Sequence, residues 1–226
     1  MERETRDRID GHWSRRFGVP VPGLAPVMVA ATGRYDDAAL VVLLGDHAYV
    51  DAPIERAQDV AALVLPQSPA AVLDPYTWTP LASAPALGPA DHFWADHATD
   101  LPAGADPLDP EQCDELRAVV PEAEWREAGF DRTPHACFGI VEDHRLIAAS
   151  VLTTLWGWPV DVGVLVAPDA RGRGLGSRVA SAALAAGVGL SGFAAFRVAR
   201  TNAASRGIAG RLGLTAYGAN LAVPLG

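Results

Sequence analysis

The sequence predicts a mixed α/β protein in which helices and strands alternate along the chain. Short runs rich in Val, Leu and Ile recur between segments whose apolar residues have helical spacing, and Gly, Pro or Asp bound most of these runs. Half of the 226 residues are apolar, which is enough for a sizeable core. Interleaved elements of both kinds are typical of the mixed α/β (α+β) class.

The first part of the chain is predicted to form a small N-terminal α/β unit. Ile9, Trp13 and Phe17 recur every four residues, so residues 5–17 should be a helix with one apolar stripe. Three strands and a second helix are expected after it, at residues 26–32, 39–45, 47–53 and 54–65. Gly45 and Asp46 separate the second and third strands as the turn of a hairpin.

The chain from Pro66 to Pro110 is rich in proline and small residues, which indicates a crossover or linker without regular elements. We place the domain boundary near Gly88. Residues 1–88 then form the N-terminal unit, and residues 89–226 form a second domain.

The second half carries clearer boundaries between its elements. Asp109 is a candidate helix cap, and Pro110 suits the first helical position. Helices are expected at residues 109–120, 121–128, 177–187 and 203–212. Strands are expected at residues 135–141, 145–156, 158–168, 192–201 and 215–225.

Composition excludes several classes of protein. The formal net charge is −9, whereas a general nucleic-acid binder needs a surplus of Lys and Arg, so no nucleic-acid partner is expected. No apolar run is long enough to span a bilayer, and the first ten residues are charged where a signal peptide needs an apolar core. We therefore predict a cytoplasmic protein without a membrane partner, either monomeric or homodimeric.

Histidine and cysteine spacing gives no sign of a metal site. His92 and His97 belong to no H-E-x-x-H motif, and Cys113 and Cys137 form no C-x-x-C pair. We predict that the protein holds no metal. Two isolated cysteines also fit a reducing compartment.

The most informative stretch is Arg171-Gly172-Arg173-Gly174-Leu175-Gly176, between a predicted strand and a predicted helix. A helix N-terminus presents unpaired N–H groups and partial positive charge, and glycines let a phosphate approach the backbone closely. The chain has no Gly-Lys pair for a P-loop, and Ser177 stands where a dinucleotide-binding G-x-G-x-x-G motif requires glycine. The turn therefore suits a pyrophosphate of another ligand class.

The turn matches R-x-x-G-x-G and resembles the acetyl-CoA-binding turn of the GNAT superfamily of N-acetyltransferases. The resemblance extends over about residues 90–226, because the expected order of elements is the same. The stretch "TNAASRGIAGRLGLTAYG" is similar to a second signature of that family. The resemblance implies a mostly antiparallel central sheet, splayed between its fourth and fifth strands, with the N-terminal unit as a possible degenerate half of the same fold.

The resemblance also implies how acetyl-CoA is bound. The arginines and glycine amides of the turn would hold the pyrophosphate, and the fourth strand would align its backbone with pantetheine and stabilise an oxyanion. The residues expected to contact CoA are Val164, Leu165, Val166, Arg171, Gly172, Arg173, Gly174, Leu175, Gly176, Ser177, Asn202, Ser205 and Arg206. Asn202 can equally be an ordinary helix cap.

Catalytic residues are less clear from the sequence. Many family members carry a carboxylate base on the fourth strand, and Asp161 is the carboxylate there, one residue from the expected place; a β-bulge would absorb this offset. Other candidates for the base are the hairpin residues Glu142, Asp143 and His144. Ala209 stands where the family often has a Tyr that protonates the thiolate.

The expected function is therefore acetyl transfer from acetyl-CoA to the amine of a small molecule, by direct attack in a ternary complex. Two alternatives remain open at this stage: a non-catalytic acyl-CoA-binding sensor, and an acetyltransferase for protein N-termini or lysines.

Overall fold

A computed structural model describes residues 1–97 and 104–226, which divide into two compact units. The N-terminal unit comprises Glu2–His92, Val198–Asn202 and Ala216–Gly226. The turn unit, named for the glycine turn that it carries, comprises Phe93–Arg197 and Ala203–Thr215 together with Met1. The C-terminal residues thus belong to the same unit as the N-terminal helix, and the domain boundary near Gly88 stays a prediction.

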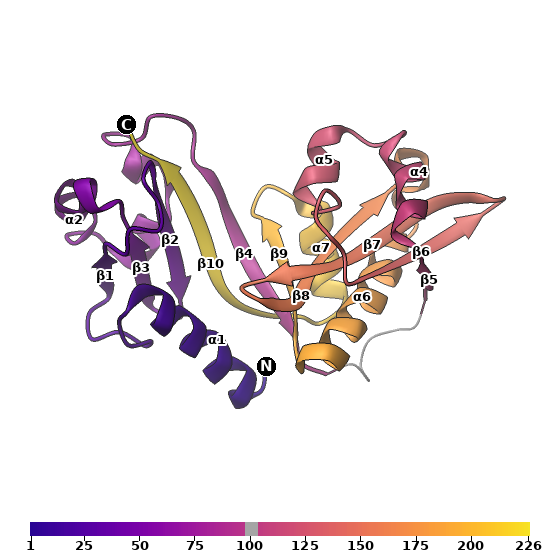
Figure 1. The fold of residues 1–226 in the computed structure, drawn as a ribbon, viewed down its shortest axis with the longest axis horizontal. Helices are drawn as coiled ribbons and strands as arrows, with labels where there is room; N and C mark the ends of the chain where they lie inside the picture. Colours follow the sequence, from indigo (N-terminus) through magenta and orange to yellow (C-terminus); the bar gives the residue numbers. More distant parts are fainter. Residues whose placement is uncertain (98–103) are drawn as a thin grey trace. The chain divides into compact units, whose positions relative to one another are not determined.

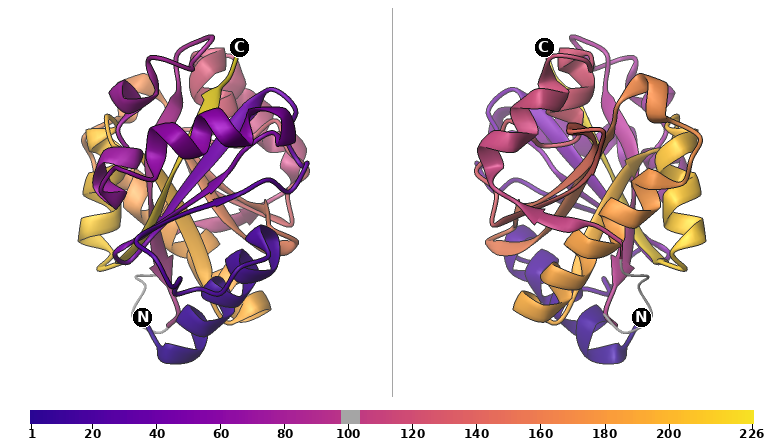
Figure 2. Two further views of the ribbon diagram at one scale, coloured as in Figure 1. Left: turned by 90° about the vertical axis from the view of Figure 1, so that its left-hand side faces the viewer. Right: turned by 90° about the vertical axis from the view of Figure 1, so that its right-hand side faces the viewer.

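The N-terminal unit contains the elements expected for residues 1–65. Its helices and strands are α1 (Arg3–Phe17), β1 (Val27–Ala30), β2 (Ala38–Leu44), β3 (His47–Asp51) and α2 (Ala57–Val64), the last preceded by a 3₁₀ turn at Ile54–Arg56. The apolar stripe of α1 is buried, as its spacing predicts. β2 and β3 form the expected antiparallel hairpin, while β1 pairs in parallel with β3. Figure 2 shows α2 lying across the strands of this unit.

The segment from Pro66 to Pro110 corrects the sequence analysis, which predicted no element there. It contains α3 (Pro69–Val72), a 3₁₀ turn (Pro75–Trp78), β4 (Leu87–Ala95) and β5 (Asp106–Leu108). Ser68 caps α3 by accepting a hydrogen bond from the Ala71 N–H, and Pro69 occupies the first turn. Pro69 and Pro75 therefore begin short elements here instead of interrupting them.

The turn unit is built on a sheet with helices packed against it (Figure 1). Its remaining elements are α4 (Asp114–Arg117), α5 (Glu122–Glu127), β6 (Ala136–Glu142), β7 (Arg145–Leu155), β8 (Trp158–Val166), α6 (Leu175–Ser191), β9 (Ala194–Ala199) and α7 (Ala203–Arg211). The last strand of the chain, β10 (Thr215–Pro224), pairs antiparallel with β2 of the N-terminal unit. The mixed α+β class is confirmed.

Strand pairing in the turn unit follows the expected pattern. The order β5-β6-β7-β8 is antiparallel throughout, and β9 joins β8 in parallel. β8 and β9 correspond to the strands that the family resemblance numbers fourth and fifth. Their register pairs Asp161 with Ala195 and, in the described part of these strands, gives no further pair toward Val166, so the two strands part as expected.

The two faces of β8 contact different helices. Gly163 faces the end of α5 so closely that a Cβ at this position would lie 1.6 Å from the Ala128 carbonyl oxygen. Val164 and Val166 lie on the other face, beside Gly176 of α6. A register shift between Thr153 and Thr154 leaves Val160 as an extra residue in β8, a β-bulge directly before Asp161.

Among the described residues, no helix combines the length and the apolar character that crossing a membrane would require.

Candidate active site

The glycine turn connects the end of β8 to the start of α6. β8 ends at Val166, a 3₁₀ turn occupies Pro168–Ala170, and α6 begins at Leu175. Gly172 and Gly174 have φ angles of 80° and 78°, in the left-handed region that favours glycine. The reversal of the chain at the start of α6 therefore depends on these two residues.

The surroundings of the turn fit an anionic ligand. A Cβ at Gly172 or Gly174 would meet no other atom within 4 Å, so the space in front of this backbone is open. The first N–H groups of α6 have no partner within the helix, and this 17-residue helix adds partial positive charge there. The turn thus combines space, donors and charge for a pyrophosphate.

Both arginines of the turn are paired with carboxylates. Arg171 donates from Nη2 to Glu124 Oε2 at 2.6 Å and from Nε to the Val166 carbonyl oxygen at 3.2 Å. Arg173 donates from Nη2 to both carboxylate oxygens of Glu142, at 2.7 and 2.8 Å. The arginine side chains are 47% and 48% exposed, so these ion pairs are weak and a phosphate can compete for the guanidinium groups. The sequence analysis did not foresee either partner for this role.

The start of α6 packs closely on α7. A Cβ on Gly176 would lie 2.8 Å from Ile208 Cδ1, and Ser177 Oγ accepts a hydrogen bond from Arg211 Nε at 3.0 Å. Ser205 and Arg206 lie in the first turn of α7, within the same unit. Asn202 directly precedes α7 but belongs to the N-terminal unit, and its N–H donates to the Ala199 carbonyl oxygen. The roles of these residues toward CoA stay predictions.

The end of β8 has one paired edge and one edge where its neighbour departs. Val164, Leu165 and Val166 pair with β7, whereas β9 pairs with β8 at Asp161 and then diverges. Alternate backbone groups of a strand point to its two edges, so some N–H and C=O groups here face the side that β9 leaves. A chain of amides such as pantetheine can bind such an edge as an added strand.

Asp161 lies at the point where β8 and β9 part, and two arginines hold its carboxylate. Arg197 of β9 donates from Nε to Oδ1 at 3.1 Å and from Nη2 to Oδ2 at 2.6 Å. Arg132, in the loop before β6, donates from Nη1 to Oδ2 at 3.0 Å. Burial lowers the pKa of Arg197, but the neighbouring Asp161 carboxylate outweighs this effect, so that pKa lies above its ordinary value.

These contacts argue against Asp161 as a proton acceptor. Both of its oxygens already accept charged hydrogen bonds, and its side chain is 9% exposed. Arg197 interrupts an otherwise apolar strand, a signal that could have flagged it from the sequence. Arg132 carries no such signal, because it lies in a loop.

The other catalytic candidates are also accounted for in the structure. Glu142 pairs with Arg173, and Asp143 and His144 form the β6–β7 turn with positive φ angles. Ala209 is fully buried in α7. The Tyr217 hydroxyl donates to Asp10, with burial as the main cause that raises the pKa of this phenol.

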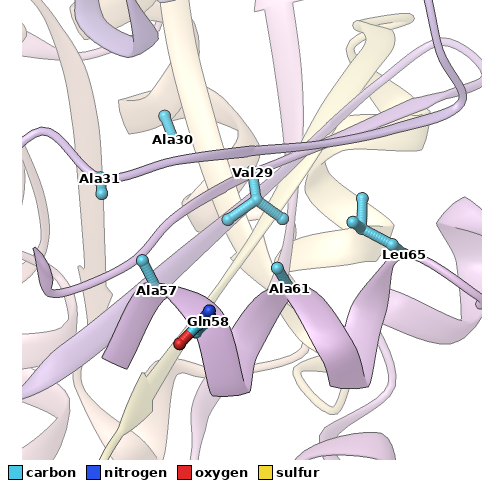
Figure 3. A pocket seen from close by; sticks show the side chains of 7 residues that line it. All are labelled: Val29, Ala30, Ala31, Ala57, Gln58, Ala61 and Leu65. Atoms are coloured by element: carbon cyan, nitrogen blue, oxygen red, sulfur yellow. The ribbon is translucent and has the colours of Figure 1, made fainter. Parts of the chain in front are cut away.

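Other features of the described residues offer no comparable chemistry. A hollow of about 380 Å³ lies between β1 and α2, and Gln58 is the one polar side chain that lines it (Figure 3). No group of three or more His, Cys, Asp or Glu in the described ranges is placed to hold a metal ion.

Comparison with known proteins places the turn unit in a family. The acetyltransferase (GNAT) family matches residues 94–214, which is more than half of the chain. The chain belongs to the GNAT family of acetyltransferases. No curated protein matches it.

Several solved structures are similar to this chain. A putative GNAT acetyltransferase from Novosphingobium aromaticivorans is 21% identical, with 62% of this chain and 66% of that chain covered and a TM-score of 0.47. A GCN5-related N-acetyltransferase from Kribbella flavida is 19% identical, with coverage of 67% and 63% and a TM-score of 0.46. A Drosophila protein is 14% identical, with coverage of 87% and 63% and a TM-score of 0.50. The match thus spans about two thirds or less of the length of these three chains.

Family membership supports acyl transfer as the chemistry of this GNAT protein, and the family generally uses acetyl-CoA. The glycine turn, the parting of β8 and β9 and the start of α6 all lie inside the matched residues.

Proposed function

We propose that this GNAT protein is an acetyl-CoA-dependent N-acetyltransferase that acts on the amine of a small molecule by direct transfer in a ternary complex. The observation that supports it most is the open glycine turn at the N-terminus of α6, flanked by Arg171 and Arg173. Bound acetyl-CoA would supply a thioester carbonyl for attack by the amine nitrogen, with the CoA thiolate as the leaving group.

The work of the chain in this reaction is to bind, orient and stabilise charge. The guanidinium groups of the turn would exchange Glu124 and Glu142 for phosphate oxygens, which accept stronger charged hydrogen bonds. Backbone N–H groups within Val164–Val166 would donate to the oxygen that becomes negative during attack. Alignment by these groups provides much of the rate acceleration that such a transfer needs.

Proton transfer needs little help from the protein in this proposal. The ammonium group loses one proton to solvent before attack, and the attacking nitrogen loses a second proton to solvent after it. The thiolate, a modest base, departs without a tyrosine at position 209. We assign Asp161 to holding Arg132 and Arg197 in place, since its oxygens are occupied by their N–H groups. Asp161→Asn should then leave the pH–rate profile unchanged in shape, whereas loss of the acidic limb of that profile would restore Asp161 as the base.

The decisive test is isothermal titration of the protein with acetyl-CoA, with NAD and ATP as controls. We expect micromolar binding of acetyl-CoA alone. Arg173→Glu should weaken that binding by roughly 10- to 100-fold, because it removes a charged hydrogen-bond donor and adds repulsion. Arg126→Glu, an exposed arginine of α5 that pairs with Glu122 and with no residue of the turn, is the control and should bind normally. Unchanged affinity in Arg173→Glu would remove the turn from the CoA site.

The occupied carboxylate of Asp161 and the alanine at position 209 also favour a second candidate, a non-catalytic acyl-CoA sensor. An acetyltransferase releases CoA thiol when it acts, whereas a non-catalytic sensor does not. Acetyl-CoA binding without thiol release across small amines and basic peptides would favour the sensor. Release with peptides alone would favour an acetyltransferase for protein N-termini or lysines.

A further inference from the structure

A cluster of three charged side chains lies beside the proposed site of transfer and is not needed to bind CoA. It consists of Arg132, Asp161 and Arg197, and we call it the Arg132–Asp161–Arg197 cluster. We propose that this cluster binds a carboxylate of the acceptor, so that the enzyme acetylates amines that also carry a carboxylate, as amino acids do. This inference rests on the proposed function and names its substrate class.

The cluster has a surplus of positive charge. Two guanidinium groups surround one carboxylate, at 2.6 Å for the Arg197 ion pair and 3.0 Å for the Arg132 ion pair. The whole chain, in contrast, has 27 acidic and 18 basic residues. A net positive site in an acidic protein concentrates anions locally. One further carboxylate, from a ligand, would neutralise the cluster.

Donors of both arginines remain available for such a ligand. Arg197 uses Nε and Nη2 for Asp161, and Arg132 uses Nη1, so each guanidinium keeps N–H groups without a partner in the described part of the chain. The arginine side chains are 45% and 30% exposed for Arg132 and Arg197, whereas that of Asp161 is 9% exposed. The buried carboxylate therefore anchors two arginines whose side chains are partly exposed. Such preorganisation reduces the entropy lost when a ligand carboxylate binds.

The location of the cluster suits an acceptor. Asp161 pairs with Ala195 where β8 and β9 begin to part, and Arg197 lies two residues further along β9, on the same face as Ala195. Val164, where the proposed thioester site begins, is three residues along β8, which is about 10 Å for an extended strand. An arginine side chain and an amino-acid-sized ligand together bridge this distance.

The loop that carries Arg132 is held against the same strand. The Ala128 carbonyl, at the end of α5, lies over Gly163. Because alternate residues of a strand share a face, Asp161 lies on the same face of β8 as Gly163. The face with Val164 and Val166 is the one beside α6. The cluster is thus separated from the pyrophosphate turn, and a change in it should alter acceptor binding without altering CoA binding.

The test compares amines with and without a carboxylate. The protein is assayed for CoA thiol release with acetyl-CoA and three such pairs: phenylalanine and phenethylamine, tyrosine and tyramine, and lysine and cadaverine. A fourth pair, phosphoethanolamine and ethanolamine, differs in a phosphate and tests whether any anion suffices. We expect kcat/KM at least tenfold higher for a carboxylate-bearing member than for its decarboxylated partner. Equal or faster turnover of the decarboxylated amines overturns the inference, and so does a preference for phosphoethanolamine over every carboxylate.

Arg132 provides the variant, because it donates one hydrogen bond to the buried Asp161, whereas Arg197 donates two. Arg132→Gln should raise KM for the preferred amino acid by roughly 10-fold or more and leave KM for acetyl-CoA and for the decarboxylated amine unchanged. A purely structural role would change all three values together. Arg126→Gln, on the exposed surface of α5, is the matched control.

Failure of this inference can be distinguished from failure of the proposed function. If acetyl-CoA does not bind, the proposed function is wrong. If it binds but no amine is turned over, each amino acid is titrated into the CoA complex. Binding that Arg132→Gln weakens supports the cluster as a carboxylate site, and the absence of any amino-acid binding overturns it.

Discussion

Glu142 pairs with Arg173 and so competes with a phosphate of CoA for the same guanidinium group. Their bidentate ion pair has the same geometry that a phosphate would need from Arg173, so the ligand must first displace the carboxylate. Because the pair is about half exposed, it contributes at most about 1 kcal/mol, and it competes only weakly.

Removal of the Glu142 charge should therefore strengthen acetyl-CoA binding. For Glu142→Gln we expect Kd to fall by roughly two- to fivefold, the range that a weak exposed ion pair allows. Calorimetric titration at low salt is the measurement. Glu122→Gln, which removes an α5 carboxylate paired with Arg126, should leave Kd unchanged. Weaker binding in Glu142→Gln would mean that Glu142 positions Arg173 for CoA instead of competing for it.

At the scale of elements, the contact between β8 and the end of α5 decides where the Arg132 loop lies. Gly163 permits this contact, because any side chain there would overlap the Ala128 carbonyl, a backbone atom that cannot move away cheaply. A lone glycine in an apolar strand is a sequence signal for such an approach, although the sequence does not name the partner.

Gly163→Ala should accordingly lower the free energy of unfolding by on the order of 3 kcal/mol, through overpacking. The matched variant is Gly189→Ala in α6, where a Cβ meets no atom within 4 Å; helix propensity should there raise stability by up to about 1 kcal/mol. Urea unfolding of both variants gives the comparison. Equal stability of the two variants would show that α5 can move away from β8.

At the scale of the whole molecule, stability depends on pH through His12 of α1. Burial, followed by the charges of Arg16, Arg15 and Arg34, lowers the pKa of His12 from 6.5 to about 4. Because the folded state holds this proton less tightly than the unfolded state, unfolding takes up a proton between these pH values. The contribution of neutral His12 to the free energy of unfolding is complete above about pH 6.5 and is lost as the pH falls toward 4.

We expect the free energy of unfolding to drop by about 1–2 kcal/mol over this range because of His12, with allowance for its partial exposure. His12→Gln should have a flatter pH dependence between pH 6.5 and 4.5, measured by urea unfolding at each pH. Identical slopes for the two proteins would show that His12 titrates normally in the folded state.

The sequence alone determined the order of elements, the mixed α+β class and the family, because these features depend on local patterns. Examples are the apolar stripe of α1, the turn between β2 and β3, and the glycine turn, whose positive φ angles follow from residue type. The prediction that the chain between Pro66 and Pro110 has no regular elements was wrong, because proline begins elements as readily as it ends them.

Only the tertiary structure decided what the charged residues do. Arg132 and Arg197 lie 29 and 36 residues from Asp161 along the chain, and Arg173 lies 31 residues from Glu142. Pairing over such separations depends on strand register and helix packing, which no local pattern specifies. The sequence therefore located the turn that suits CoA, whereas the partners of Asp161, and the acceptor class that we infer from them, required the fold.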